Sequence, residues 1–120
     1  MTIKKLEDID VIDGGEGTEI RQIFHPHNTL NGIRYSISHS ELKYGKKSKL
    51  HKIKSSEVYY ILQGEGTLQI DDEFIKVSKD QSIYIPPNSK QCIENKGKDE
   101  LKILCIVEPA WQQEDETILE

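Results

Sequence analysis

Long apolar runs, a cysteine framework and an excess of basic charge are all missing from this sequence. The apolar residues occur in runs of only a few, whereas a membrane-spanning helix needs about 20 in succession. The two cysteines, Cys92 and Cys105, form no CxxC or Cys/His spacing, so we expect reduced thiols and no structural zinc. Charges are scattered through Met1–Asp13, where a secretion signal would be apolar. We therefore expect a cytoplasmic protein that has no membrane partner.

Basic charge is scarce, because 16 Lys and Arg stand against 21 Asp and Glu and the net charge is −5. A nucleic-acid-binding protein needs a basic surface that displaces phosphate counterions, so we expect no nucleic-acid partner. One segment differs, because it holds lysines and no acid: Lys43, Lys46, Lys47, Lys49, Lys52 and Lys54. We interpret this lysine run as a solvated loop and strand edge, and a funnel for an anionic substrate is the alternative.

Helical periodicity is nearly absent, and alternation between apolar and polar residues takes its place. Ile33–Leu42 alternates strictly, and turn signals such as Asp13–Gly17 and Asn31-Gly32 recur at intervals of roughly 8 to 12 residues. The expected strands are 19–24, 33–42, 49–54, 57–62, 67–70, 73–77, 82–85, 90–94 and 101–107, and a short helical turn is expected after Pro109. Short strands without crossover helices indicate an all-β, antiparallel sandwich or barrel. The pattern alone does not choose between a jelly roll, an immunoglobulin sandwich and a lipocalin.

Two segments decide between these folds. The first reads Gly45, five residues, His51, one residue, Ile53, three residues, Glu57, six residues and Gly64. This spacing resembles the first sequence motif of the cupin family, in which a second histidine stands at the place of Ile53. The other four motif positions are present in register.

The second segment resembles the second cupin motif more loosely. Pro86 and Asn95 match outright, whereas Asp80 and Asn88 take the places of glycines and Gln91 takes the place of a histidine. Asn tolerates a positive φ better than other non-glycine residues, so the change at Asn88 is mild. The resemblance implies a double-stranded β-helix, the jelly-roll barrel of cupins. We expect a barrel over residues 31–108, an N-terminal arm and first strand over 1–30 that can be exchanged in a dimer, and an acidic tail over 109–120.

The resemblance also implies a metal site at the barrel mouth. In the family, three imidazoles and one carboxylate hold Fe, Mn, Ni, Cu or Zn, a donor set that suits these ions. Here His51, Glu57 and Gln91 are the candidate ligands, and Ile53 cannot ligate. The expected cofactor is a divalent transition metal that is weakly held or absent. An ordinary buried hydrogen bond between Gln91 and Glu57 is the alternative.

Further candidate site residues follow from alternation and from the family register. Tyr59 shares the inward face with Glu57, and the resemblance adds Ile103 and Cys105. The candidate catalytic residues are Glu57 and Tyr59. The candidate substrate contacts are Arg34, Ser36, Ser38, Gln91 and Cys105, next to Ser40. For Arg34 the alternative is a solvated strand end, for Tyr59 core packing, and for Cys105 either an inert thiol or an oxidisable group beside a metal.

Three histidines lie outside both motifs. His25-Pro26-His27 has the form of a ligand pair without an obvious third donor, so we interpret both as loop histidines; reaching over a neighbouring barrel is the alternative. His39 shares the apolar face of the predicted strand with Tyr35 and Ile37, which indicates a core or interface residue. Because 101–107 is apolar on both faces and a small barrel has one interior, the sequence predicts a homodimer packed through this sheet.

Two functions remain open at this stage. The first is a stand-alone cupin that binds a small polar or anionic molecule, such as a sugar acid or sugar phosphate, and acts as a divalent-metal-dependent isomerase, lyase or dioxygenase. Without metal, Glu57 would be a general base, with Tyr59 or His51 as the proton donor. The second is a non-catalytic small-molecule-binding barrel that has lost its metal site, as Ile53 indicates.

Overall fold

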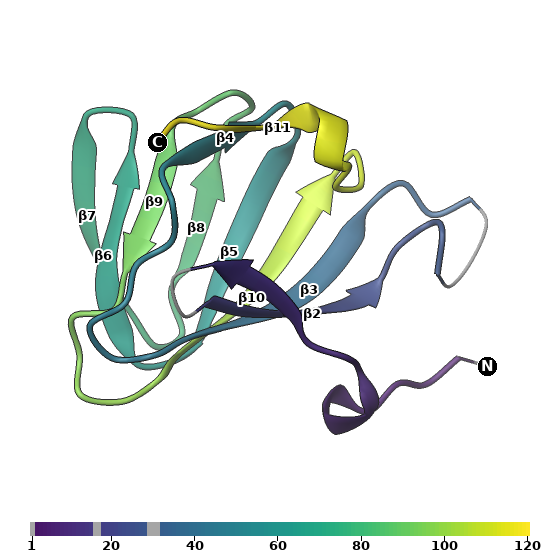
Figure 1. Ribbon diagram of the computed structural model, residues 1–120, viewed down its shortest axis with the longest axis horizontal. Coiled ribbons are helices and arrows are strands. Elements are labelled where there is room, and N and C mark those ends of the chain that lie inside the picture. The colour runs from purple at the N-terminus through teal and green to yellow at the C-terminus, as the bar shows by residue number, and fades with distance from the viewer. Residues whose placement is uncertain (1, 16–17, 29–31) are drawn as a thin grey trace.

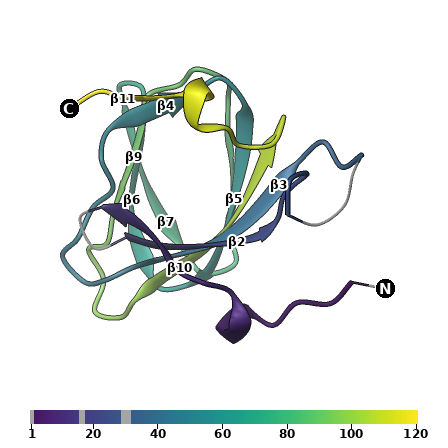
Figure 2. The same ribbon diagram turned by 45° about the vertical axis from the view of Figure 1, so that its right-hand side comes forward.

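Two antiparallel β-sheets face each other and form a barrel, which is open to view in Figure 2. The computed structural model describes residues 2–15, 18–28 and 32–120. Its strands are β1 (Ile12–Gly15), β2 (Thr18–Phe24), β3 (Ser36–Leu42), β4 (His51–Ile53), β5 (Ser56–Gln63), β6 (Glu65–Ile70), β7 (Glu73–Ser78), β8 (Ser82–Ile85), β9 (Gln91–Glu94), β10 (Leu101–Glu108) and β11 (Glu116–Ile118). Two short 3₁₀ helices, η1 (Leu6–Asp8) and η2 (Gln113–Asp115), lie near the termini.

The first sheet has the order β1-β2-β3-β10-β5-β8, and the second has the order β11-β4-β9-β6-β7 (Figure 1). This is the all-β, antiparallel jelly roll that the sequence predicts, so the expected fold class is confirmed. In the described part of the chain, no helix is long and apolar enough to cross a membrane.

The core lies between the sheets and is built by alternation. Along β10, and along β5 as far as Ile61, every second side chain is buried. The central cluster consists of Leu42, Tyr59, Ile61, Leu68, Val77, Ile85, Ile93, Leu101, Ile103 and Cys105. Full burial of one such aliphatic side chain contributes roughly 1.5–3 kcal/mol. Strand alternation therefore decides which polar residues share this interior.

The loop before β9 places the second motif against β4. Asn88 adopts a φ of +63°, and its N–H donates to the carbonyl of Ile53 at 2.8 Å. Asparagine tolerates this left-handed conformation, which explains how it can occupy a glycine position. The contact fixes the approach of β9 to the strand that carries His51.

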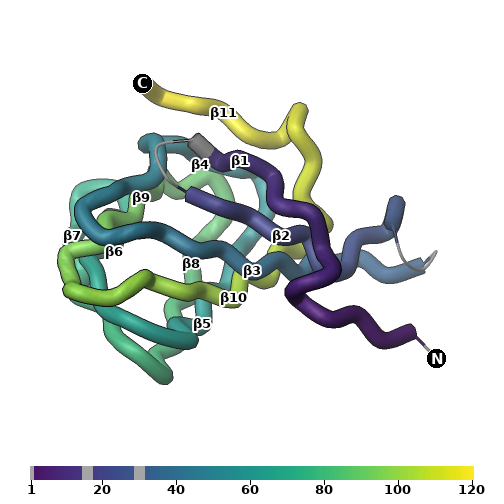
Figure 3. Tube along the Cα trace, turned by 60° about the horizontal axis from the view of Figure 1, so that its bottom comes forward, coloured from purple at the N-terminus to yellow at the C-terminus, as the bar shows by residue number. Residues whose placement is uncertain are grey.

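Both ends of the chain contain more strand than the sequence predicts. Residues expected to form a flexible turn, Asp13–Gly15, belong to β1, where Asp13 pairs with Glu19 of β2. The rest of that turn, residues 16–17, and Asn31 lie outside the described residues. The expected helical turn after Pro109 is η2, but β11 follows it and pairs with β4. Figure 3 shows both terminal segments alongside the barrel.

Candidate functional site

A buried chain of hydrogen bonds joins three of the predicted site residues. Glu57 and Tyr59 come from β5, and Gln91 faces them from β9 in the other sheet. The Tyr59 hydroxyl donates to Oε1 of Gln91 at 2.8 Å, and Nε2 of Gln91 donates to Oε1 of Glu57 at 2.5 Å. Their exposed fractions are 6% for Glu57, 7% for Tyr59 and 1% for Gln91. The barrel interior thus holds a carboxyl group with a defined hydrogen-bond donor.

Burial controls the protonation of this chain. Desolvation raises the pKa of Glu57, and Glu116 adds to that effect, whereas the Gln91 hydrogen bond and His51 lower the pKa. Desolvation, followed by the Glu57 charge, raises the pKa of Tyr59 well above 10. Tyr59 therefore stays protonated and donates, while burial favours the protonated form of Glu57.

His51 stands at the rim beside this chain. It lies directly across from Gln91 in the β4–β9 pairing, and its side chain is partly exposed. Its Nδ1 donates to the Lys49 carbonyl at 2.7 Å, which leaves Nε2 as the acceptor of the neutral ring. Ile53, at the family's second histidine position, is buried. The rim thus offers one imidazole nitrogen.

The donor set does not fit a tightly held transition metal. Both functional atoms of Gln91 are engaged, since its carbonyl accepts from Tyr59 and its amide donates to Glu57. Only His51 and Glu57 remain as donors of the expected set, and Ile53 contributes none. Among the described residues, no three His, Cys, Asp or Glu side chains gather closely enough to hold a metal ion. Three or four such donors are usual for these metals.

The serine strip of β3 lines the same interior, without Arg34. Ser36 is buried, and its hydroxyl accepts from the Trp111 N–H at 3.0 Å. Ser40 Oγ lies 3.7 Å from the Cys105 sulfur, and Ser38 pairs with Cys105 across the strands. Burial and the Glu57 charge raise the pKa of Cys105 to about 12, so this residue is a thiol and not a reactive thiolate.

Arg34 lies just before β3 and is exposed, so the structure does not bring it to the Glu57–Gln91–Tyr59 chain. Its backbone carbonyl accepts from the N–H of Ala110, which follows β10. Arg34 therefore contacts the segment after β10 through its backbone carbonyl.

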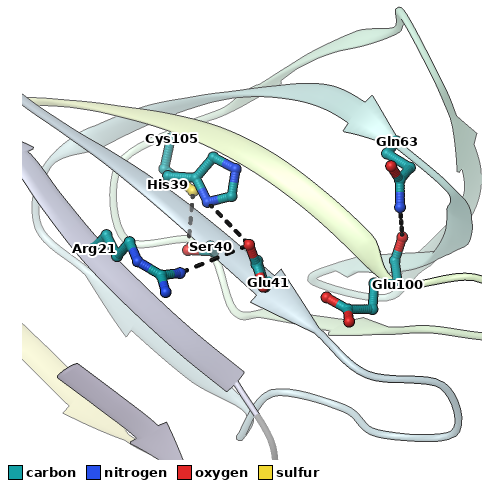
Figure 4. Close-up of polar contacts among 7 residues, drawn as sticks. All are labelled: Arg21, His39, Ser40, Glu41, Gln63, Glu100 and Cys105. Carbon is teal, nitrogen blue, oxygen red and sulfur yellow. Dashed lines mark hydrogen bonds and ion pairs between the residues drawn. The ribbon is translucent and has the colours of Figure 1, made fainter. Parts of the chain in front are cut away.

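The three histidines outside the motifs have separate surroundings. His25 is buried, its Nε2 donates to the Trp111 carbonyl at 2.7 Å, and its ring stacks on His27. His39 points away from the barrel interior, beside Arg21 and Glu41 (Figure 4). Through its hydrogen bond to Trp111, His25 holds the segment that follows β10 against the barrel.

One group at the mouth was absent from the sequence-based set. Glu116 of β11 pairs with Ile53 of β4, and Oε2 of Glu116 accepts from the Trp111 indole N–H at 3.2 Å. Directly opposed residues of two strands point to the same face, so Glu116 faces the mouth. No sequence signal marks this pairing, because the residues are far apart in the chain and β11 is very short.

Comparison with known proteins supports the same fold and family. Residues 38–107 match the Cupin domain family. An uncharacterized protein of Methanocaldococcus jannaschii is 42% identical over 106 residues, which are 88% of this chain and 84% of that protein. Mannose-1-phosphate guanylyltransferase of Salmonella montevideo is 26% identical over 122 residues, and the match covers 97% of this chain but 26% of that enzyme.

Solved structures agree in fold. A predicted oxalate decarboxylase from Thermotoga maritima superposes with a TM-score of 0.77 at 21% identity, over 90% of this chain and 99% of that chain. At this level of identity the likeness concerns the barrel itself and not its chemistry.

Proposed function

This chain belongs to the cupin domain family, and on that premise we propose that it binds a small polar or anionic molecule, such as a sugar acid or sugar phosphate, at the barrel mouth. The ligand would lie beside His51 and reach the Glu57 carboxyl group. The observation that carries this proposal is the buried Tyr59–Gln91–Glu57 hydrogen-bond chain.

A carboxyl group inside a small barrel needs a reason. Burial of the Glu57 carboxyl group costs desolvation free energy, which an apolar side chain at this position would avoid. Here the hydrogen-bonded polar groups of Glu57, Gln91 and Tyr59 stand where apolar packing would be expected. Gln91 orients the Glu57 carboxyl group and is itself oriented by Tyr59. Such a supported, proton-exchanging group is typical of a binding or acid–base site rather than of a core.

Metal-free acid–base chemistry is the reaction type that this geometry favours. The Glu57 carboxylate would accept a proton from the ligand, and a protonated His51 at the rim would return one to another ligand atom. These two proton transfers together would isomerise the ligand or eliminate a group from it, and neither reaction needs an external oxidant. A binding barrel without catalysis would use the same contacts and leave the ligand unchanged.

Two observations favour a sugar phosphate among anionic ligands. The lysine run includes Lys49, which lies two residues before His51, just outside β4. The matched enzymes include mannose-1-phosphate guanylyltransferases, which align over nearly the whole of this chain. From the name of these enzymes we take only the ligand class, a sugar phosphate, as the proposed ligand of this barrel.

The test is an NMR titration of the ¹⁵N-labelled protein with mannose 1-phosphate, and with mannose as the uncharged comparison. We expect saturable shifts at the amides of His51 and Gln91 for the phosphate, and weaker binding in Glu57→Gln. Glu73→Gln is the matched control, because Glu73 is exposed at the start of β7. No shift near these residues with mannose 1-phosphate would contradict the sugar-phosphate proposal.

Elemental analysis of protein purified without a histidine tag addresses the metal-dependent alternative. A stoichiometric transition metal that is lost in His51→Ala would favour a metal-dependent isomerase, lyase or dioxygenase. The donor set of one imidazole and one carboxylate leads us to expect substoichiometric metal.

We also propose that the protein is a homodimer that packs through the outer face of the β2-β3-β10-β5 sheet. Leu104 and Ile106 of β10 are only half-buried there, and Ile37 and Val58 flank Ile106. Charges of both signs, including Arg21 and Glu41, border this apolar strip. A two-fold axis could bring such a mixed-charge surface against its own copy without like-charge repulsion.

A further inference from the structure

The last residues of the chain close one edge of the second sheet, next to the candidate site. The Leu119 N–H donates to the Leu50 carbonyl at 2.9 Å, and the Lys54 N–H donates to the Asp115 carbonyl at 3.1 Å. The Leu50 N–H in turn donates to Oε1 of Glu120 at 3.0 Å. Through these bonds β11 lies along β4, the strand that carries His51 (Figure 1).

This strand adds side chains to the mouth of the barrel. In the β4–β11 pairing Ile118 lies opposite His51, and Glu116 lies opposite Ile53. Opposed residues share a face, and Ile53 is buried in the interior, so both β11 side chains face the mouth. Glu116 is half-buried and brings a negative charge close to Glu57 and Tyr59.

The segment that follows β10 is held more firmly at its root, Pro109–Trp111, than at its end, β11 and the residues after it. At the root, buried groups bind the backbone: Ser55 Oγ donates to the Pro109 carbonyl at 2.7 Å, Ser36 accepts from the Trp111 N–H, and His25 donates to the Trp111 carbonyl. These contacts tie the segment to three separate parts of the barrel.

The end of the segment has no such burial. β11 has only three residues, and Thr117, Ile118 and Leu119 are exposed. Exposed hydrogen bonds with little apolar burial open at a small fraction of the global unfolding free energy. The end can therefore detach from β4 while Pro109 and Trp111 stay in place.

We propose that residues 112–120 form a gate over the candidate site, and that Glu116 is the specificity-determining side chain which this gate carries. With β11 paired, the Glu57–Gln91–Tyr59 chain is shut from solvent and an incoming anion meets the Glu116 carboxylate. Detachment of β11 opens the mouth, removes that charge and frees the β4 edge between Lys49 and Lys54. The role of Glu116 rests on the anionic ligand proposed above, whereas the opening of the gate does not.

Amide hydrogen exchange tests the gate without any ligand. We expect the Lys54 and Leu119 amides to exchange at least about tenfold faster than the Ile61 amide, whose core position reports global unfolding. Leu119→Pro removes the donor to Leu50 and should speed exchange at Lys54 further, with Ile61 unchanged. Leu119→Ala keeps the N–H and is the matched control. Exchange at Lys54 as slow as at Ile61 would overturn the gate.

Affinity for mannose 1-phosphate tests the part assigned to Glu116. Removal of one partly exposed like charge should tighten binding about two- to fivefold in Glu116→Gln, and Leu119→Pro should also tighten it. Glu114→Gln removes an exposed carboxylate of the same segment and should change nothing. Binding that is equal in the wild type, Glu116→Gln and Leu119→Pro would overturn this part. Absence of binding in every variant would refute the sugar-phosphate proposal and with it the assigned role of Glu116, while the exchange data would still decide the gate.

Discussion

At the scale of single residues, the environment of each polar group decides what it can do. Glu57 and His39 are both buried titratable groups, but Glu57 has a dedicated hydrogen-bond donor and His39 has none among the described residues: its Nδ1 makes no hydrogen bond and lies 3.9 Å from Glu41. The sequence could place Glu57 on the inward face by its spacing. It could not show that Gln91 would direct its amide toward that carboxyl group.

His39 leads to a prediction about pH. Desolvation, with Lys102 and Arg21, lowers the pKa of His39 below 6.5, and Glu41 only partly opposes this. The unfolded chain therefore binds more protons than the folded chain, so the His39 contribution to stability is lost as the pH falls below about 6.5. We expect His39→Gln to become progressively more stable relative to wild type between pH 7.5 and pH 5, measured by urea unfolding.

The control for this prediction is Gln112→Asn, because Gln112 is exposed and carries no titratable group. Its unfolding free energy relative to the wild type should stay constant at every pH. A constant difference between His39→Gln and wild type across the same range would show that His39 does not titrate differently in the folded state.

At the scale of elements, the tight turns explain why the first motif needs its glycines. Gly45 and Gly64 have φ values of +77° and +87°, which non-glycine residues rarely adopt. At Gly64, between β5 and β6, a Cβ would also lie 2.7 Å from the carbonyl oxygen of Glu100. At Gly45 a Cβ would meet nothing within 4 Å. The two positions therefore share a backbone requirement and differ in packing.

This difference can be measured by substitution with alanine. Gly45→Ala should lower the free energy of unfolding by about 1–2 kcal/mol, the cost of a left-handed conformation for a residue with a Cβ. Gly64→Ala should cost more, because the backbone of Glu100 cannot move away as a flexible side chain could. Equal losses in urea unfolding would show that the close approach at Gly64 has no energetic effect.

At the scale of the whole molecule, the barrel has one interior and an apolar strip outside it. The buried side chains of β10 point into the interior. The outward side chains of the same strand, Leu104 and Ile106, stay half-exposed in a single copy of the chain. A contiguous apolar strip on a sheet commonly marks an interface. The proposed dimer would cover it.

We expect light scattering to give twice the chain mass of 13.8 kDa at micromolar concentration. Ile106→Glu places a charge in the strip and should give the monomer, with an unchanged far-ultraviolet circular dichroism spectrum. Phe74→Glu is the control, because Phe74 of β7 is 70% exposed on the other sheet and its replacement should leave the dimer intact. A wild-type mass of one chain would refute the dimer.

The sequence by itself determined most of the strands, because alternation and turn residues act over a few neighbouring positions. Its resemblance to the cupin motifs supplied the jelly-roll class and the inward position of Glu57. It placed Gln91 by motif spacing alone. Only the tertiary structure decided the partners of Gln91, the exposure of Arg34 and the pairing of β11 with β4. These depend on which distant segments meet across the barrel, and a segment as short and polar as β11 becomes a strand only because β4 offers it an open edge.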